Sequence, residues 1–259
     1  MRVAVCVKQI PDTADPPALD PQDHTLVGEG KLIMDESDSY GVEMGLQLAQ
    51  AGGGGEVSLI SMAPNRETNG LRTALAIGAS SAVVVSDPLL AGSDALGTAK
   101  VLAAVIGRLG ADLVIAGTES TDGYTGTTPV QVAELLGWPS VSFAEHVEIL
   151  EGLLRVRRQT EAGYDEITCP LPAVVTVTSG AVEPRYPSFK GIAAAKSKPV
   201  AQVTLADLGL DPSQVGFSGA RQRVISVEAA ETRRAGEIVV DQGDAHERLL
   251  SFLEQLKVL

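Results

Sequence analysis

Residues Ala111–Pro139 read ADLVIAGTESTDGYTGTTPVQVAELLGWP and contain the three parts of a strand–loop–helix unit. The apolar run Leu113–Ala116 predicts a short buried strand. A loop of mostly Gly, Ser, Thr and Asp follows. Thr128 is then a good N-cap, Pro129 suits the first helical position, and Gln131, which follows the cap by three residues, can complete a capping box. The stretch therefore predicts a strand, a polar loop and a helix capped by Thr128.

The polar loop, residues 118–128, has the composition of an anion-binding loop. Its small residues let backbone N–H groups approach a ligand, and the helix N-terminus behind them attracts negative charge. We interpret the loop as a phosphate cradle. An ordinary solvated loop before a capped helix stays open as the alternative, and Asp122 could simply be a solvated loop residue.

Strands and helices alternate along the first half of the chain. Apolar runs predict strands at residues 2–7, 57–62, 82–85 and 113–116, and helical patterns predict helices at about 40–51, 71–77, 96–109 and from Thr128 onward. The fold class is therefore α/β: a Rossmann-like, doubly wound, mostly parallel sheet with helices on both faces. In such sheets ligands bind beyond the carboxyl ends of the strands. We expect the loops at 8–14, 35–39, 62–66 and 117–128 to converge there.

The second half of the chain has a different pattern. Residues 147–150 and 153–159 flank a Glu151-Gly152 turn and predict a hairpin, and residues 166–169 and 172–178 predict two further strands. The α/β domain is expected to span residues 1–198. Residues 199–259 are too irregular for an independent domain, although 246–258 carry a helical stripe, and we expect them to form a C-terminal arm that packs on a partner subunit.

Composition excludes several classes of function. The formal charge of −13 argues against nucleic-acid binding, which needs clustered Lys and Arg. Cys6 and Cys169 lie inside apolar runs and are expected to be buried thiols, and the three His share no metal-ligand spacing, so no metal is expected. Met1 leads straight into a strand-like run and no apolar run approaches about 18 residues, so we expect a soluble, cytoplasmic protein.

No catalytic constellation is recognisable in the sequence. There is no nucleophile with a partner base and no Walker lysine, and the first strand is followed by Lys8-Gln9-Ile10-Pro11 rather than a Gly-rich pyrophosphate loop. We therefore expect a binding protein without catalytic residues of its own.

Several motifs, in order along most of the chain, resemble one known family. They are Val5–Thr13 (VCVKQIPDT), Ala74–Ala79, Ala111–Val114 through Trp138-Pro139, Pro170–Thr176 (PLPAVVT) and Glu183–Ser188 (EPRYPS). In this order and spacing they resemble the beta subunit of electron-transfer flavoproteins. The last pair, a Pro-Ala-Val-Val-Thr strand leading to a Glu-Pro-Arg-Tyr turn, is the most specific.

The resemblance implies an electron carrier. It would form a heterodimer with an alpha subunit that carries most of a shared FAD site, while the beta subunit buries AMP. Its electrons would come from acyl-CoA and related dehydrogenases of fatty acid oxidation and pass to a membrane quinone reductase. The implied cofactor-binding residues, including one from the loop at 62–66, are Cys6, Val7, Lys8, Asp35, Asp38, Met62, Ser120, Asp122, Gly123, Thr125, Gly126, Thr127 and Thr128.

Residues 183–198 match the family's recognition loop, which anchors the carrier on its dehydrogenase through one apolar side chain. Phe189 occupies the anchor position, where family members more often have Leu. A single exposed anchor ringed by polar residues suits fast release. Local core packing of Phe189 is the alternative. The implied partner-binding residues are Glu183, Pro184, Arg185, Tyr186, Phe189 and Lys190.

Two alternatives remain for the nucleotide loop. Asp122-Gly123-x-Thr125 resembles the electron-bifurcating branch of the family, in which the beta subunit holds a second FAD in place of AMP. A nucleotide-hydrolysing or nucleotide-sensing protein of similar α/β architecture is the other. Nucleotide exchange distinguishes a carrier from a hydrolase or sensor, because a structural nucleotide should survive gel filtration and a substrate or signal should not.

Overall fold

A computed structural model describes residues 1–14, 18–27, 31–63, 65–228, 236 and 238–259. Pro64 of the expected loop at 62–66 lies outside the described residues, as do residues 229–235 and 237 of the expected arm. The chain divides into two units, Met1–Ile225 and Ser226–Leu259. The first unit holds all the strands of the structure that are described below.

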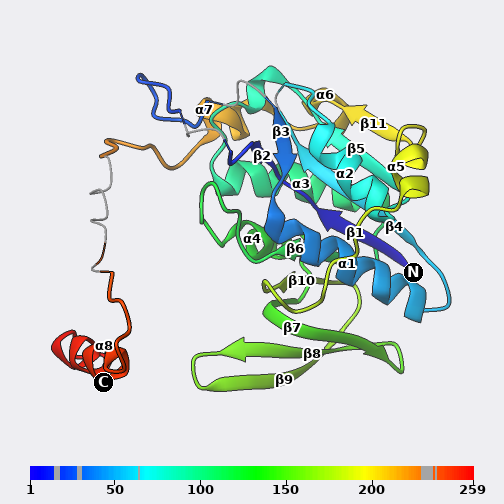
Figure 1. Ribbon diagram of the computed structural model, residues 1–259. Helices are drawn as coiled ribbons and strands as arrows, with labels where there is room; N and C mark the ends of the chain where they lie inside the picture. The colour runs from blue at the N-terminus through cyan, green and yellow to red at the C-terminus, as the bar shows by residue number, and fades with distance from the viewer. Residues whose placement is uncertain (15–17, 28–30, 64, 229–235, 237) are drawn as a thin grey trace. The chain divides into compact units, whose positions relative to one another are not determined.

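A nine-stranded sheet in the order β11-β5-β4-β1-β6-β10-β7-β8-β9 forms the centre of the first unit (Figure 1). From β11 to β7 the neighbours are parallel, and β8 and β9 are antiparallel additions. The strands are β1 (Arg2–Cys6), β4 (Glu56–Met62), β5 (Ser81–Val85), β6 (Leu113–Gly117), β7 (Ser140–Leu150), β8 (Leu153–Thr160), β9 (Gly163–Pro170), β10 (Ala173–Val177) and β11 (Val200–Val203). The chain winds from β1 through β4 to β5 in one direction and then restarts at β6 on the other side. The order therefore reverses between β1 and β6, which confirms a doubly wound sheet.

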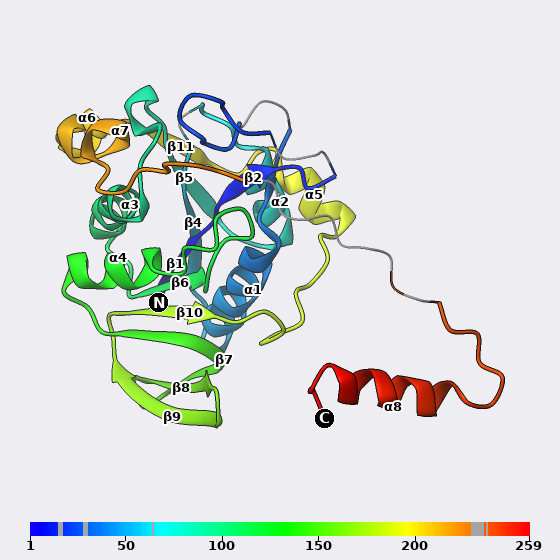
Figure 2. The same ribbon diagram turned by 90° about the vertical axis from the view of Figure 1, so that its left-hand side faces the viewer.

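Two layers of helices cover the sheet, as Figure 2 shows with the strands between them. On one face lie α1 (Glu36–Ala51), α2 (Asn69–Ile77) and α5 (Phe189–Ala195), and on the other lie α3 (Ala95–Leu109), α4 (Thr128–Leu136) and α6 (Leu205–Leu208). Short 3-10 turns η1 (Pro88–Leu90) and η2 (Pro212–Gln214) and the single turn α7 (Gly216–Gly219) complete the unit.

The two faces of the sheet carry two separate apolar cores. Successive strand residues point to opposite faces, so Leu59 packs toward α1 and α2 while Ile60 packs toward α3 and α4. Both side chains are fully buried, as are all five residues of β6 and of β10. This is why the central strands are continuous apolar runs rather than alternating ones.

Helix α1 begins earlier than its sequence pattern predicts. The expected start near Tyr40 is wrong, because Asp35 is the N-cap and its side chain accepts a hydrogen bond from the Ser37 amide. Asp38 consequently lies in the first helical turn. The segment before α1 is tied back to the sheet end by a short antiparallel pair, β2 (Gln9–Pro11) with β3 (Leu32–Met34).

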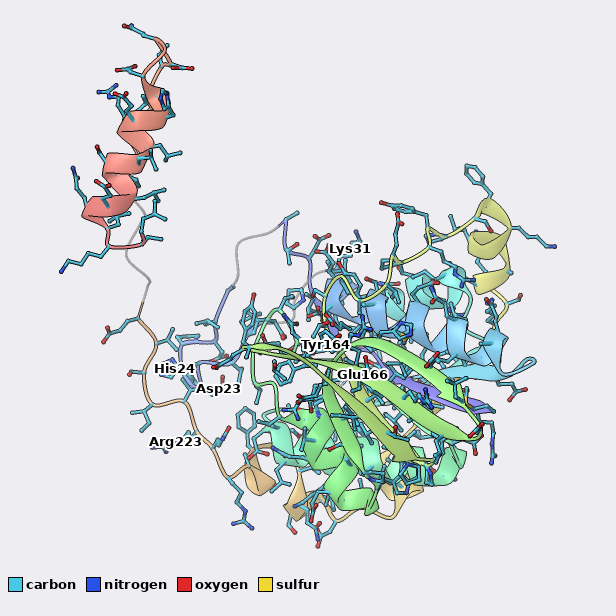
Figure 3. All side chains as sticks on the ribbon, turned by 90° about the horizontal axis from the view of Figure 1, so that it is seen from below. Asp23, His24, Lys31, Tyr164, Glu166 and Arg223 are labelled. Atoms are coloured by element: carbon cyan, nitrogen blue, oxygen red, sulfur yellow. The ribbon has the colours of Figure 1, made fainter. Side chains whose placement is uncertain are left out.

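The predicted hairpin is confirmed and is longer than expected. Glu151 and Gly152 form its turn with φ of 54° and 81°, and β9 adds a third strand. Tyr164 and Glu166, labelled in Figure 3, lie two residues apart on one face of β9. The Arg157 guanidinium contacts both, with Nε 3.0 Å from a Glu166 carboxylate oxygen and its carbon 4.6 Å from the Tyr164 ring centroid.

The C-terminal residues are divided differently from the expected boundary after residue 198. Residues Val200–Val203 form β11, which extends the main sheet by pairing with β5, and the chain up to Ile225 belongs to the first unit. The second unit contains α8 (Ala245–Gln255), which has no buried residue among those described.

We expect Gly70→Ala to destabilise the fold, because a Cβ there would lie 2.7 Å from the Met34 amide nitrogen and 2.9 Å from the Ile33 carbonyl carbon. Overpacking of this kind costs about 1–3 kcal/mol of the free energy of unfolding. Gly107→Ala in α3 is the matched control, since no described atom lies within 4 Å of the added Cβ. It should gain about 0.5–1 kcal/mol from helix propensity. Urea unfolding of both variants checks the pair, and a stabilising Gly70→Ala would contradict the close approach.

Candidate functional site

The loop after β1 contacts the loop after β6 through Lys8. Its ammonium lies 2.6 Å from Oδ1 of Asp122 and 3.2 Å from Oγ of Ser120. These strands are neighbours at the point where the strand order reverses, which is where doubly wound sheets bind ligands. The structure therefore brings three of the predicted site residues together at the expected place. An ammonium has three N–H donors, so one remains for a ligand anion.

Asp35 ties the start of α1 to the same loop. Its side chain is fully buried, and one carboxylate oxygen accepts hydrogen bonds from the Thr121 amide at 2.7 Å and the Thr121 hydroxyl at 2.9 Å. The other oxygen accepts from the amide and hydroxyl of Ser37 at 3.0 and 2.7 Å. Both oxygens are thus satisfied within the chain, so Asp35 holds the loop in place rather than presenting a free carboxylate.

Asp38 lies beside Cys6 beneath the two loops. Its carboxyl group accepts a hydrogen bond of 2.6 Å from the Lys8 amide and another from the Gly117 amide, and it is buried. Burial raises the pKa of Asp38 to about 8 in spite of these bonds. Burial, with a smaller contribution from the charge of Asp38, raises the pKa of the Cys6 thiol to about 12. A thiol with so high a pKa is a poor nucleophile. Cys169 is buried as expected, whereas Cys6 as a whole is partly exposed and lines the cavity described below.

The close approach of β6 to α1 requires Gly117. A Cβ at this position would lie 3.0 Å from Oγ of Ser37 and 3.1 Å from Oδ1 of Asp38. Farther along the loop, Tyr124 and Gly126 have φ of 47° and 66°, in the left-handed region that favours glycine. Gly117 and Gly126 are therefore the two positions at which the structure gives a local reason for glycine.

The start of α4 corrects the predicted capping box. Thr127, not Thr128, is the N-cap, Pro129 is the second helical residue, and among the described side chains none forms a cap hydrogen bond. The Gln131 side chain instead donates to the Thr127 hydroxyl at 3.1 Å. The first-turn amides of α4 are consequently not occupied by a side-chain cap, which suits an anion-binding helix terminus.

A cavity of about 450 Å³ opens between these loops, the sheet and helices α3 and α4. Its volume falls in the roughly 300–1,000 Å³ range of small-molecule sites. Its floor is apolar, with Ile60, Val114 and Val174 among the lining residues. Nine predicted site residues line it: Cys6, Val7, Lys8, Asp38, Met62, Ser120, Thr125, Gly126 and Thr128. Asp35, Asp122, Gly123 and Thr127 belong to the surrounding loops rather than to the lining.

Part of the cavity wall was not predicted from the sequence. Residues Leu90–Asp94 and the first turn of α3 line it as well. Asp94 is the N-cap of α3, because its side chain accepts from the Gly97 amide at 2.8 Å. It also accepts from the Arg221 amide at 2.7 Å. The sequence signal that could have identified this part of the wall is that the loop directly follows a predicted strand, β5.

The predicted partner-binding residues lie away from the cavity, and none of them lines it. Tyr186 and Phe189 are 93% and 94% exposed, so Phe189 does not pack into the core. Arg185 is different, because its guanidinium forms an ion pair with the buried Glu43. Glu183 and Lys190 are exposed and Pro184 is partly exposed.

The described residues contain neither a cluster of metal ligands nor a membrane-spanning helix. No group of three or more His, Cys, Asp or Glu among them is placed to hold a metal ion. No helix among them is long and apolar enough to cross a membrane.

Fold and site together define a doubly wound α/β protein with a small-molecule cavity at the switch point of its sheet. Residues 23–208 match the family described as electron transfer flavoprotein domain. The chain is 37% identical over 263 residues to the electron transfer flavoprotein subunit beta of Mycobacterium tuberculosis, with 99% of each chain covered. It is 35% identical to that of Thermoanaerobacterium thermosaccharolyticum (99% and 98% covered) and 33% identical to the caffeyl-CoA reductase-Etf complex subunit CarD of Acetobacterium woodii (92% of each). The chain belongs to the electron transfer flavoprotein beta-subunit family.

The raised pKa of Asp38 predicts a pH dependence of stability. Between about pH 4, its ordinary pKa, and pH 8, the folded chain keeps a proton that the unfolded chain releases, so the free energy of unfolding falls as pH rises. The contribution is at most about 1.4 kcal/mol per pH unit. In Asp38→Asn, urea unfolding between pH 5 and 8 should show a flatter dependence than in the unsubstituted protein. Asp165→Asn, at an exposed position of β9, is the control. Equal slopes in all three proteins would contradict burial of a protonated Asp38.

Proposed function

We propose that this chain is the beta subunit of a heterodimeric electron-transfer flavoprotein that holds AMP in the 450 Å³ cavity. The observation that carries the proposal is the convergence of Lys8, the uncapped start of α4 and the loop after β6 on one cavity. These groups suit the phosphate, and the apolar floor suits a purine ring. The nucleotide supports the subunit and takes no part in electron transfer.

The proposed redox cofactor is one FAD shared with the alpha subunit. When bound, the flavin accepts and donates the electrons, and the residues of this chain bind the flavin, position it and exclude water from it. The neutral Cys6 thiol and the paired Asp35 supply no redox or nucleophilic group, which suits a carrier rather than an enzyme. The proposed electron donors are acyl-CoA and related dehydrogenases, and the acceptor is a membrane quinone reductase.

The proposed contact with the alpha subunit is the C-terminal arm. The apolar side chains Leu249, Leu250 and Phe252 of α8 and Leu256 at its C-cap are all more than half exposed. Apolar side chains gathered on one short helix are typical of a surface that a partner covers. The exposed Tyr186 and Phe189 are the proposed contact with the dehydrogenase.

A bifurcating carrier with a second FAD in the cavity is the second candidate. It is favoured by Asp122-Gly123-x-Thr125 and by the likeness to a subunit named for a caffeyl-CoA reductase-Etf complex. The Lys8–Asp122 ion pair would then position the loop for a larger ligand. A nucleotide hydrolase or sensor is the third candidate, which predicts a ligand that exchanges.

Nucleotide analysis of the co-expressed heterodimer tests the assignment. After gel filtration and denaturation we expect one FAD and one AMP per heterodimer. Two FAD would support the bifurcating candidate, and one FAD with no further adenine nucleotide would contradict nucleotide binding by this subunit. Lys8→Met should lower AMP retention, because it removes the ammonium at the loop. Lys31→Met, which removes an ammonium paired with Asp12 instead, is the control.

Phe189→Ala tests the contact with the dehydrogenase. Removing an exposed aromatic anchor from the centre of an interface typically costs more than 1 kcal/mol of binding free energy, about a fivefold change in affinity. We expect slower electron transfer from an acyl-CoA dehydrogenase, with FAD content unchanged. Phe189→Leu should keep most of the rate, and Leu153→Ala, an exposed apolar residue on the hairpin, should keep all of it. An unchanged rate in Phe189→Ala would remove the anchor role.

A further inference from the structure

Residues Glu183–Lys198 are held to the domain at both ends, while their middle is exposed. Between β10 and α5 the chain has no regular secondary structure. Its exposed side chains cannot fix their own positions, because Tyr186 and Phe189 keep over nine-tenths of their surface in solvent. What orients them must therefore be the contacts made by the residues on either side.

The contact at the N-terminal end is a forked ion pair between Glu43 of α1 and Arg185. Glu43 is 3% exposed, and its two oxygens lie 2.7 and 2.9 Å from Nε and Nη2 of Arg185. The Arg185 amide, at 3.3 Å, and the Gln47 side chain, at 2.8 Å, also donate to this carboxylate. Burial raises the pKa of Glu43, but the hydrogen bonds outweigh it and lower the pKa overall. The carboxylate therefore stays charged, with both oxygens occupied.

The contact at the C-terminal end is a reciprocal exchange between α2 and α5. Arg72 of α2 donates to the carbonyls of Ala195 and Lys198 at 2.7 and 2.9 Å. Lys198 in turn donates to the carbonyls of Leu75 and Ala79 at 2.8 and 2.6 Å. Each cation thus satisfies carbonyls at the C-terminal end of the other helix. This contact holds the C-terminal end of α5 to α2.

The two contacts leave a short exposed span that begins directly after Arg185. Phe189 is the first residue of α5, which Ser188 caps by accepting from the Gly191 amide at 3.0 Å. A Cβ at Gly191 would lie 2.4 Å from the Ala76 carbonyl oxygen, so α5 sits directly on α2 and the side chain of Phe189 is left in solvent. Loss of the Arg185 contact would free one end of this span while α5 stayed attached.

We propose that Glu43 is a positioning residue for dehydrogenase docking: through Arg185 it holds Tyr186 and Phe189 in the orientation that the partner binds. The inference rests on the proposed function, in which these exposed residues are the docking surface. Its physical basis is preorganisation, because an ordered loop pays less conformational entropy on binding than a free one. Glu43 itself is buried and does not contact the dehydrogenase.

Glu43→Gln in the co-expressed heterodimer tests the proposal, since it keeps the shape of the side chain and removes its charge. The apparent KM of an acyl-CoA dehydrogenase for the carrier should rise about 5- to 10-fold, as for loss of a hot-spot contact, with kcat and FAD content unchanged. Amide hydrogen exchange should become faster at residues 183–188 and stay unchanged at 193–198, where Arg72 and Lys198 still hold the chain. Glu134→Gln is the control for the charge, because it lies exposed on α4.

A mutant cycle separates positioning from general stability. If Glu43 acts through Phe189, combining Glu43→Gln with Phe189→Ala should raise the KM little beyond the larger single effect. Arg185→Lys, which keeps the charge but not the fork, should give an intermediate KM and serves if Glu43→Gln folds poorly. Additive effects, or an unchanged KM in Glu43→Gln while Phe189→Ala raises it, would overturn this inference alone. An unchanged KM in Phe189→Ala would overturn the docking surface itself.

Discussion

The buried carboxylate of Asp35 is the contact on which the candidate site depends. It is fully buried and accepts four hydrogen bonds, two from Ser37 at the start of α1 and two from Thr121 in the loop after β6. A buried carboxylate is stable only when its oxygens accept hydrogen bonds. Neither the helix nor the loop can therefore move away without leaving one of these oxygens buried and unpaired. Lys8, in the loop after β1, contacts Asp122 and Ser120 of the same loop after β6. The shape of the cavity follows from these few polar contacts at the sheet's switch point.

The cavity and residues 183–198 lie on opposite faces of the sheet. The cavity lies toward α3 and α4, whereas residues 183–198 are attached to α1 and α2. Helix α1 belongs to both sites, because Asp35 and Asp38 at its start support the loops and Glu43, further along, holds Arg185. In the function that we propose, a tightly held nucleotide would stabilise the domain while a small exposed surface on the other face binds and releases a partner quickly.

Sequence reasoning was reliable for strands and weaker at helix starts. The apolar runs of β1, β4, β5 and β6 are buried on both faces, so their pattern is strong and local. Caps are degenerate, because Thr127 and Thr128 are chemically alike and only the backbone path decides which one precedes the helix. The start of α1 is equally hard to place from the sequence, because residues 35–39 read DESDS and Asp and Ser both cap helices, whereas the structure has Asp35 as the N-cap. Strand β11 was missed because only four residues form it, and pairing with the distant β5 makes it a strand.

The sequence by itself determined the class of fold, the polar loop before α4 and the resemblance to one family, because these depend on residue types and their order. Tertiary structure decided which groups meet. Glu43 and Arg185 are 142 residues apart and form a forked ion pair. Asp38 lies beside Cys6, where burial raises the pKa of both side chains. Such effects depend on distance and burial in space, which residue types and their order do not specify.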